Sequence, residues 1–248
     1  MNLDRCTLGT AGLGGIWGPV DPQESVRSIL LALENGIQAI DTAPAYGDAE
    51  TYVGEALRQW KGKPPQISTK VGRLKGYKAD EGFYDYSAAG MQRSVEQSLE
   101  TLGVPVLDVL FLHDPHQLKQ ETDEHVLETL LSFKHLGYTK KIGIGGNPPT
   151  WMASFLETGL FDVLMEFNQL NACNTIALQE HLPVCLAHNI LYYAASPLNM
   201  GLLGGAYKIF VDHPPAWLDR KLIDTAIWLK SLADAHNLSL PSLAHRFL

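Results

Sequence analysis

Short apolar runs alternate with amphipathic segments along the whole chain. The apolar runs are nearly continuous, which is typical of parallel strands that are buried on both faces. We expect seven strands, over residues 6–12, 37–41, 66–70, 107–113, 140–145, 162–167 and 190–195. The segments between the strands carry helical patterns, and this β-α alternation predicts an α/β fold of the barrel type.

The predicted helices have recognisable ends. Asp21 is a good N-cap, because Pro22 follows at the first helical position and Glu24 at the third. A later helix ends at Gly103, since glycine readily takes the left-handed conformation that closes a helix. Further helices are expected over residues 48–58, 122–136, 149–158, 174–187 and 219–236, with a short one from Pro241 to Leu248.

Two connections are longer than a tight loop requires. They cover residues 71–87 and 198–217, and each follows the carboxyl end of a predicted strand. Long loops in compact domains are often functional, and α/β barrels build their sites at the carboxyl ends of their strands. We therefore expect a site beside these two loops.

Several predicted strands end in side chains that complement one another chemically. Asp41, Lys70 and His113 lie at three strand ends, and Tyr46 follows Asp41 by five residues. Asp41 could pair with Lys70 and keep it charged, and the ammonium would then lower the pKa of Tyr46 from its free value of about 10. Tyr46 could exchange a proton with a substrate oxygen that His113 orients. Taken singly, each residue is equally explained as a polar strand end that meets solvent.

Composition narrows the class of partner. The chain has 248 residues, 46% of them hydrophobic, with a formal net charge of −8. The negative charge argues against nucleic acid and favours a small-molecule or protein partner. No apolar run approaches the length of a membrane span, and Cys6, Cys173 and Cys185 show no paired spacing. We expect a cytoplasmic protein with reduced thiols, compatible with a homo-oligomer.

Three other interpretations of the polar and glycine-rich motifs are weaker. The glycines at positions 9, 12, 14 and 15 do not fit the dinucleotide fingerprint of a Rossmann unit. His113 and His116 are separated by Pro115 and have no further ligand cluster nearby, so we predict no metal site. Carboxylates such as Asp41, Asp114 and Glu166 could serve glycoside hydrolysis, although this alternative leaves Lys70 and Tyr46 without a role.

Three motifs resemble those of the aldo-keto reductases. They are DTAPAYG over residues 41–47, STKVGR over 68–73 and LDVLFLHD over 107–114. The resemblance implies a (β/α)8 TIM barrel that uses NADP or NAD, with Asp41, Tyr46, Lys70 and His113 as the catalytic set. It is closest to the subgroup of L-galactose, L-fucose and D-threo-aldose 1-dehydrogenases, and pyridoxal 4-dehydrogenase is similar.

The same resemblance implies cofactor and substrate contacts. Asn147 matches the residue that holds the nicotinamide amide. Trp17, Asp114 and the loop over residues 71–87 are candidate substrate contacts. The sequence departs from many members at Gly146, where serine is common, and at Ala195, where an aromatic ring often stacks on the nicotinamide. The implied cofactor-binding residues are Gly12, Leu13, Asn147, Ser196, Leu198 and Met200.

The carboxyl end is the largest departure from the family pattern. Members of the family continue after the last predicted helix with strand 8 and a basic segment that grips the adenosine 2′-phosphate, whereas this sequence ends at Leu248. We expect residues 1–248 to form a single barrel domain that is incomplete at its carboxyl end. The sequence is a truncated piece, a naturally short product, or a barrel that another chain completes.

The resemblance implies an NAD(P)-dependent oxidoreductase that transfers hydride between nicotinamide and C1 of an aldose. A pyridoxal 4-dehydrogenase-like activity is one alternative. Another is a non-catalytic module that senses nucleotides or binds a partner protein, motivated by the missing carboxyl-terminal segment.

Overall fold

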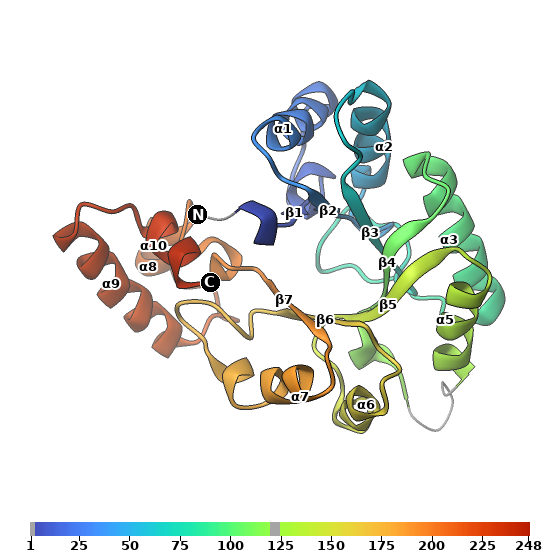
Figure 1. Ribbon diagram of the computed structural model, residues 1–248. Coiled ribbons are helices and arrows are strands. Elements are labelled where there is room, and N and C mark those ends of the chain that lie inside the picture. Colours follow the sequence, from blue (N-terminus) through green and yellow to red (C-terminus); the bar gives the residue numbers. More distant parts are fainter. Residues whose placement is uncertain (1–2, 120–124) are drawn as a thin grey trace. The chain divides into compact units, whose positions relative to one another are not determined.

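The computed structural model describes residues 3–119 and 125–248 (Figure 1). The strands of the described residues form a seven-stranded sheet whose order follows the chain, from β1 to β7. All seven expected strands are confirmed, although β1 is shorter than predicted. The strands are β1 (Leu8–Gly9), β2 (Ala39–Asp41), β3 (Gln66–Val71), β4 (Leu107–His113), β5 (Thr139–Gly145), β6 (Val163–Phe167) and β7 (Leu191–Ala195).

The chain divides into two compact units, Asn2–Val163 and Leu164–Leu248. The first unit contains β1 to β5, which pair in parallel with their neighbours. The register places Asp41 beside Ser68, Lys70 beside Phe111 and His113 beside Gly145. This register brings the strand ends that carry polar side chains to one edge of the sheet. That residues 1–248 form a single domain that lacks an eighth strand stays a prediction.

Helices follow one another around the outer side of the sheet in the first unit (Figure 1). The predicted caps are confirmed: the Asp21 carboxylate accepts a hydrogen bond from Glu24 N at 3.0 Å, and Gly103 ends its helix with φ 69°. The helix predicted over 122–136 begins at His125 within the described residues. The helices are α1 (Pro22–Glu34), α2 (Ala49–Gln59), α3 (Ala88–Leu102), α5 (His125–His135) and α6 (Thr150–Ala153), which a 3-10 turn (Ser154–Thr158) continues.

The second unit differs more from the prediction. The single helix expected over 174–187 is wrong, because a 3-10 turn (Ile176–Leu178) precedes the separate helix α7 (His181–Ala187). Pro183 lies in the first turn of α7, where its missing N–H costs nothing. A short helix, α8 (Tyr207–Asp212), lies inside the connection 198–217, and α9 (Arg220–Ala235) and α10 (Leu240–Phe247) follow.

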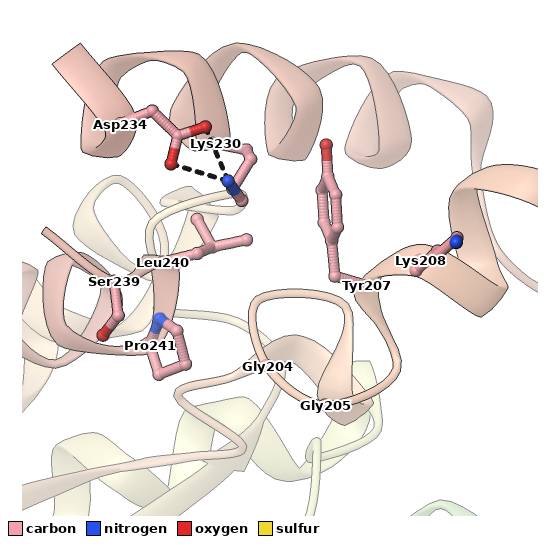
Figure 2. A pocket seen from close by; sticks show the side chains of 9 residues that line it. All are labelled: Gly204, Gly205, Tyr207, Lys208, Lys230, Asp234, Ser239, Leu240 and Pro241. Atoms are coloured by element: carbon pink, nitrogen blue, oxygen red, sulfur yellow. Dashed lines mark hydrogen bonds and ion pairs between the residues drawn. The ribbon is translucent and has the colours of Figure 1, made fainter. Parts of the chain in front are cut away.

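The second unit has its own apolar core, in which Leu202, Leu203 and Ile223 are almost fully buried. Beside it lies a cavity of about 410 Å³ between α8, α9 and α10, shown in Figure 2. Tyr207 points into the space between the helices, and Lys230 is held by the carboxylate of Asp234 at 2.6 Å. None of the helices in the described part of the chain is long and apolar enough to cross a membrane.

Candidate active site

The structure brings the predicted set of Asp41, Tyr46, Lys70 and His113 together in the first unit. The ammonium of Lys70 lies 2.5 Å from Asp41 Oδ2 and 4.7 Å from the centroid of the Tyr46 ring. The rings of Tyr46 and His113 meet edge to face, with centroids 5.6 Å apart and planes at 89°. The site therefore collects an acid, an ammonium, a phenol and an imidazole at the carboxyl ends of β2, β3 and β4.

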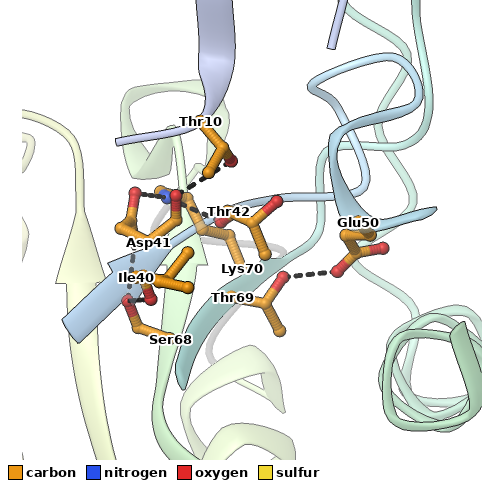
Figure 3. Close-up of polar contacts among 8 residues, drawn as sticks. All are labelled: Thr10, Ile40, Asp41, Thr42, Glu50, Ser68, Thr69 and Lys70. Atoms are coloured by element: carbon orange, nitrogen blue, oxygen red, sulfur yellow. Dashed lines mark hydrogen bonds and ion pairs between the residues drawn. The ribbon is translucent and has the colours of Figure 1, made fainter. Parts of the chain in front are cut away.

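Hydrogen bonds hold the carboxylate of Asp41 on both sides (Figure 3). Ser68 Oγ donates to Asp41 Oδ1 at 2.8 Å, while Lys70 occupies Oδ2 and also donates to Thr42 O at 2.8 Å. Thr10 Oγ1 donates to the backbone oxygen of Asp41 at 3.0 Å. With both oxygens engaged, Asp41 serves as an anchor for Lys70.

Lys70 and its neighbour Thr69 point to opposite faces of β3, as alternate strand residues do. Thr69 Oγ1 donates to the buried carboxylate of Glu50 in α2 at 2.6 Å (Figure 3). Burial raises the pKa of Glu50 above its usual value, and the hydrogen bond from Thr69 opposes this effect. The bond ties the first turn of α2 to the strand that carries Lys70, and so contributes to the placement of the ammonium.

The glycine-rich segment after β1 holds the loop that carries Tyr46. A Cβ atom on Gly14 would lie 1.6 Å from the backbone oxygen of Tyr46, and one on Gly47 would lie 2.1 Å from Gly14 O. Gly47 also has φ 59°, and Asp48 N donates to Gly14 O at 3.0 Å. The two backbones touch directly because neither residue has a side chain, a role that sequence reasoning did not assign to Gly14.

Lys70 is charged although its side chain is only 2% exposed. Burial alone would lower its pKa, but the carboxylate of Asp41 and the phenol of Tyr46 outweigh burial and raise the pKa above 10.5. A buried ammonium is stable only beside such a partner. The pairing of Asp41 with Lys70 is therefore what sequence reasoning expected.

The expected lowering of the Tyr46 pKa is wrong for the protein without ligand. Burial raises the pKa of Tyr46 above 10, and the charges of Asp41 and Asp114 raise it further. Lys70 acts in the expected direction but does not outweigh burial. Tyr46 is consequently a neutral phenol at neutral pH, a form that carries a proton to donate.

His113 is a neutral imidazole. Burial, and then the positive charges of Lys70 and Arg73, lower its pKa well below 6.5. Its Nδ1 atom is buried and has no hydrogen-bond partner among the described residues. A neutral imidazole donates one hydrogen bond without carrying a charge, which suits it to orient a polar ligand atom.

The loop 71–87 folds back on itself beside this set. Arg73 and Tyr84 form an isolated antiparallel bridge, and Asp85 N donates to Gly72 O at 2.8 Å. Tyr86 OH donates to His113 O at 2.7 Å, and so links the loop to the end of β4. Sequence reasoning names the loop 71–87 as a candidate substrate contact, but it does not predict the individual contacts of Arg73, Tyr84 and Tyr86, because the loop has no periodic pattern that predicts its path.

The two predicted substrate residues lie in the first unit. Trp17 is 63% exposed and lines a cavity of about 590 Å³ together with Tyr77. Asp114 lies one residue beyond His113 and accepts a hydrogen bond from Arg73 Nη1 at 3.0 Å. A Cβ atom on Gly12 would lie 2.9 Å from the Trp17 ring, so Gly12 leaves room for that ring.

The predicted cofactor residues are divided between the units. Gly12, Leu13 and Asn147 belong to the first unit, and Ser196, Leu198 and Met200 to the second. Ser196 and Met200 have positive φ values of 61° and 55°, so the backbone turns sharply after β7. Such turns present backbone N–H groups to anions, and the Asn147 amide complements a carboxamide, so these residue types fit a nicotinamide dinucleotide. That they form one cofactor site stays a prediction.

The carboxylate of Glu166 belongs to a different cluster. It lies in the second unit, where His181 Nδ1 is 2.8 Å from Glu166 Oε1 and Tyr192 OH donates to Oε2 at 2.9 Å. Glu166 is buried, and both of its oxygens are engaged. Asp41 is likewise fully engaged, so these two carboxylates offer no support for a glycoside hydrolase. Among the described residues, no group of three or more metal-ligating side chains could hold a metal ion.

Comparison with known proteins places the chain in a family. The family model described as "Aldo/keto reductase family" matches residues 5–248. The chain belongs to the aldo/keto reductase family. The resemblance of the motifs around Asp41, Lys70 and His113 is thereby confirmed. Members of this family are oxidoreductases that generally use NADH or NADPH.

Individual relatives are distant. L-galactose dehydrogenase of Arabidopsis thaliana is 32% identical over 226 residues, which cover 88% of this chain and 66% of that protein, just under two thirds. Pyridoxal 4-dehydrogenase of Microbacterium luteolum is 27% identical over 100% of this chain and 82% of its own length. The solved structure of a glycerol dehydrogenase from Gluconobacter oxydans superposes with a TM-score of 0.78 at 26% identity, covering 100% of this chain and 83% of that one.

Proposed function

We propose that the protein is an NAD(P)-dependent oxidoreductase that transfers hydride between nicotinamide and C1 of an aldose. The observation that carries this proposal is the neutral phenol of Tyr46 beside a charged, buried Lys70 and a neutral His113. The relatives named as sugar and polyol dehydrogenases support the choice of an aldose. The substrate is a small molecule, and a cytoplasmic location and homo-oligomer formation stay predictions.

Tyr46 is the proton donor and acceptor at the substrate oxygen in this proposal. A bound nicotinamide supplies or accepts the hydride at C1. In reduction, the phenol of Tyr46 gives its proton to the carbonyl oxygen, and the Lys70 ammonium stabilises the phenolate that remains. In oxidation, the phenolate takes the proton of the anomeric hydroxyl, and the sugar leaves as a lactone. The charge of Lys70 therefore stabilises the phenolate form of Tyr46. This role accounts for the position of the buried Lys70 ammonium beside the Tyr46 ring.

The other residues position the reaction. Asp41 keeps Lys70 charged and in place, and neutral His113 donates a hydrogen bond to the substrate oxygen. Trp17 and Asp114 contact the substrate. The residues that would hold the cofactor are Gly12, Leu13, Asn147, Ser196, Leu198 and Met200, with no preference assigned between NAD and NADP.

The test is the Tyr46→Phe variant, which keeps the ring and removes the hydroxyl. We expect turnover to fall by about 10²-fold or more, because general acid-base catalysis contributes about 10² to 10⁴-fold. Absorbance of reduced nicotinamide would be followed with NAD and NADP against a panel of aldoses, glycerol and pyridoxal. Circular dichroism would serve as the control for folding.

Three results would contradict all or part of the proposal. Retained dehydrogenase activity in Tyr46→Phe would remove Tyr46 from proton transfer. Failure of the unmodified protein to bind either nicotinamide cofactor, measured by titration calorimetry, would favour the non-catalytic alternative. Activity restricted to pyridoxal would replace the aldose by that aldehyde and leave the role of Tyr46 intact.

A further inference from the structure

The loop between β3 and α3 is fastened to the turn that carries Tyr46. Gly47 N donates a hydrogen bond to Gly76 O in this loop at 3.0 Å. The carboxylate of the next residue, Asp48, accepts a hydrogen bond from Lys75 Nζ at 2.7 Å. The first half of the loop is therefore held one and two residues beyond the phenol that exchanges the proton.

The second half of the same loop is fastened to the end of β4. Tyr86 OH donates to His113 O at 2.7 Å and lies 3.1 Å from Asp114 O. The ring of Tyr86 packs on the backbone of Gly72, so closely that a Cβ atom there would lie 2.2 Å from the ring. Gly72 directly follows β3, and its backbone oxygen accepts a hydrogen bond from Asp85 N at 2.8 Å. The Tyr86 hydroxyl thus links the end of β3 to the end of β4.

The backbone at the end of β4 turns sharply beside this hydroxyl. Asp114 has φ 51°, in the left-handed region that is uncommon for residues other than glycine. The backbone oxygens of His113 and Asp114 both lie within hydrogen-bond distance of Tyr86 OH. An uncommon backbone conformation persists where the surrounding contacts hold it, and Tyr86 supplies one of these contacts.

The imidazole of His113 is not anchored through its Nδ1 atom. This atom is buried and has no hydrogen-bond partner among the described residues. The ring instead meets the ring of Tyr46 edge to face, with centroids 5.6 Å apart. The direction of the imidazole therefore depends on packing and on the backbone that carries it, and Tyr86 holds that backbone.

We propose that Tyr86 is a positioning residue for the reaction, whose hydroxyl holds the end of β4 and so sets where the His113 imidazole meets a substrate oxygen opposite Tyr46. The loop between β3 and α3 then braces two reacting groups that follow different strands. It holds the Tyr46 turn through Asp48 and the end of β4 through Tyr86. The inference rests on the proposed function, and it assigns a role to a side chain that acts through His113.

The Tyr86→Phe variant tests this role, because it keeps the ring on Gly72 and removes only the hydroxyl. We expect kcat to fall about tenfold while the KM of the cofactor stays unchanged, since an error of about 1 Å in placing a reacting group can cost about 10²-fold in rate. Tyr138→Phe is the matched control. The Tyr138 hydroxyl donates to Glu96 Oε1 at 2.8 Å on the exposed surface, and its loss should leave kcat unchanged. An unchanged kcat in Tyr86→Phe would overturn the inference.

A double-mutant cycle shows whether the loss runs through His113. In the His113→Asn background, Tyr86→Phe should lower kcat by less than about twofold, because the imidazole that Tyr86 positions is already absent. An equal loss in both backgrounds would overturn the inference, since a purely structural role of Tyr86 affects the two proteins alike.

An NMR titration separates this inference from the proposed function, because it needs no turnover. Long-range proton–nitrogen spectra follow the ring nitrogens of His113, whose pKa burial holds well below 6.5. In Tyr86→Phe the released end of β4 should admit water, so this pKa should rise toward 6.5, while Tyr138→Phe should leave it in place.

The titration decides the inference where kinetics cannot. If the unmodified protein turns over no substrate, the proposed function fails, and if His113→Asn is too slow to measure, the cycle cannot be closed. In either case a raised His113 pKa in Tyr86→Phe would support the positioning role. A His113 pKa that does not rise in this variant would overturn it.

Discussion

A buried ion pair and an exposed ion pair lie in the first unit, and they should contribute differently to the free energy of unfolding. Lys70 and Asp41 are almost inaccessible, whereas Lys75 and Asp48, 2.7 Å apart, are half exposed. Removing one partner of a buried pair leaves an uncompensated charge, which costs about 3 to 5 kcal/mol, while an exposed pair contributes about 0 to 1 kcal/mol. The two N···O distances are similar, so the expected difference in stability follows from burial and not from distance.

We predict that Asp41→Asn lowers the free energy of unfolding by about 3 kcal/mol or more. Asparagine keeps the shape and can still accept a hydrogen bond, so the loss reports the missing charge beside Lys70. Asp48→Asn is the matched control, and it should change stability by less than about 1 kcal/mol. Urea denaturation of the two variants measures both values, and equal losses would refute the argument from burial.

At the scale of single residues, the sequence predicted the set of Asp41, Tyr46, Lys70 and His113 because all four follow strand ends. The direction of the Tyr46 pKa was not predictable, since it depends on how deeply the phenol is buried. The contact of Arg73 with Asp114 joins two residues that are 41 positions apart. A single sequence contains no signal for such a pairing.

At the scale of elements, the glycine segment after β1 and the loop that carries Tyr46 form one contact. Gly14 meets the backbone of Tyr46 and Gly47 so closely that no side chain fits there. Gly9, the last residue of β1 and directly before that segment, has no atom within 4 Å of a Cβ placed on it. Close packing therefore requires glycine at position 14, whereas a larger residue can replace Gly9.

We predict that Gly14→Ala destabilises the protein by about 3 kcal/mol or more, above the usual range for overpacking because the obstacle is backbone. Gly9→Ala, the matched control, should cost less than about 0.5 kcal/mol. Thermal and urea denaturation measure stability, and reduced-nicotinamide absorbance measures turnover, which Gly14→Ala should also lower by moving Tyr46. Equal tolerance of the two alanines would show that the loop adapts.

The elements that the sequence predicted well have strong periodic patterns or clear caps. α1 begins after Asp21 and α3 ends at Gly103, because side-chain and backbone hydrogen bonds at those residues are local. The helix expected over 174–187 was wrong because apolar residues of a 3-10 turn and of α7 fall on a continuous pattern. α8 was missed because it is short and lies in a glycine-rich connection.

At the scale of the whole molecule, each unit contains a titrating histidine, and the two respond to pH in opposite directions. In the first unit, burial and nearby positive charges lower the pKa of His113 well below 6.5. In the second unit, the hydrogen bond and charge of Glu166 raise the pKa of His181 above 6.5. His113 therefore binds a proton more readily in the unfolded chain than in the folded protein. His181 binds a proton more readily in the folded protein than in the unfolded chain.

The sign of each effect follows from this difference in proton binding. His113 lowers stability as the pH falls below about 6.5, because protons then favour the unfolded chain. The stabilising contribution of His181 is complete below about pH 6.5 and is lost as the pH rises through its raised pKa. In the unmodified protein the two dependences oppose each other, so single variants are needed to separate them.

We predict that His181→Gln destabilises the protein most at acid pH, and that the loss shrinks as the pH rises, because only the protonated ring is attracted to the buried carboxylate of Glu166. His113→Asn should instead gain stability relative to the unmodified protein as the pH falls, since the variant avoids protonation of a buried ring. Urea denaturation at about pH 5, 6.5 and 8 gives both differences. A loss in His181→Gln that is the same at all three pH values would show that His181 packs against Glu166 without carrying a charge.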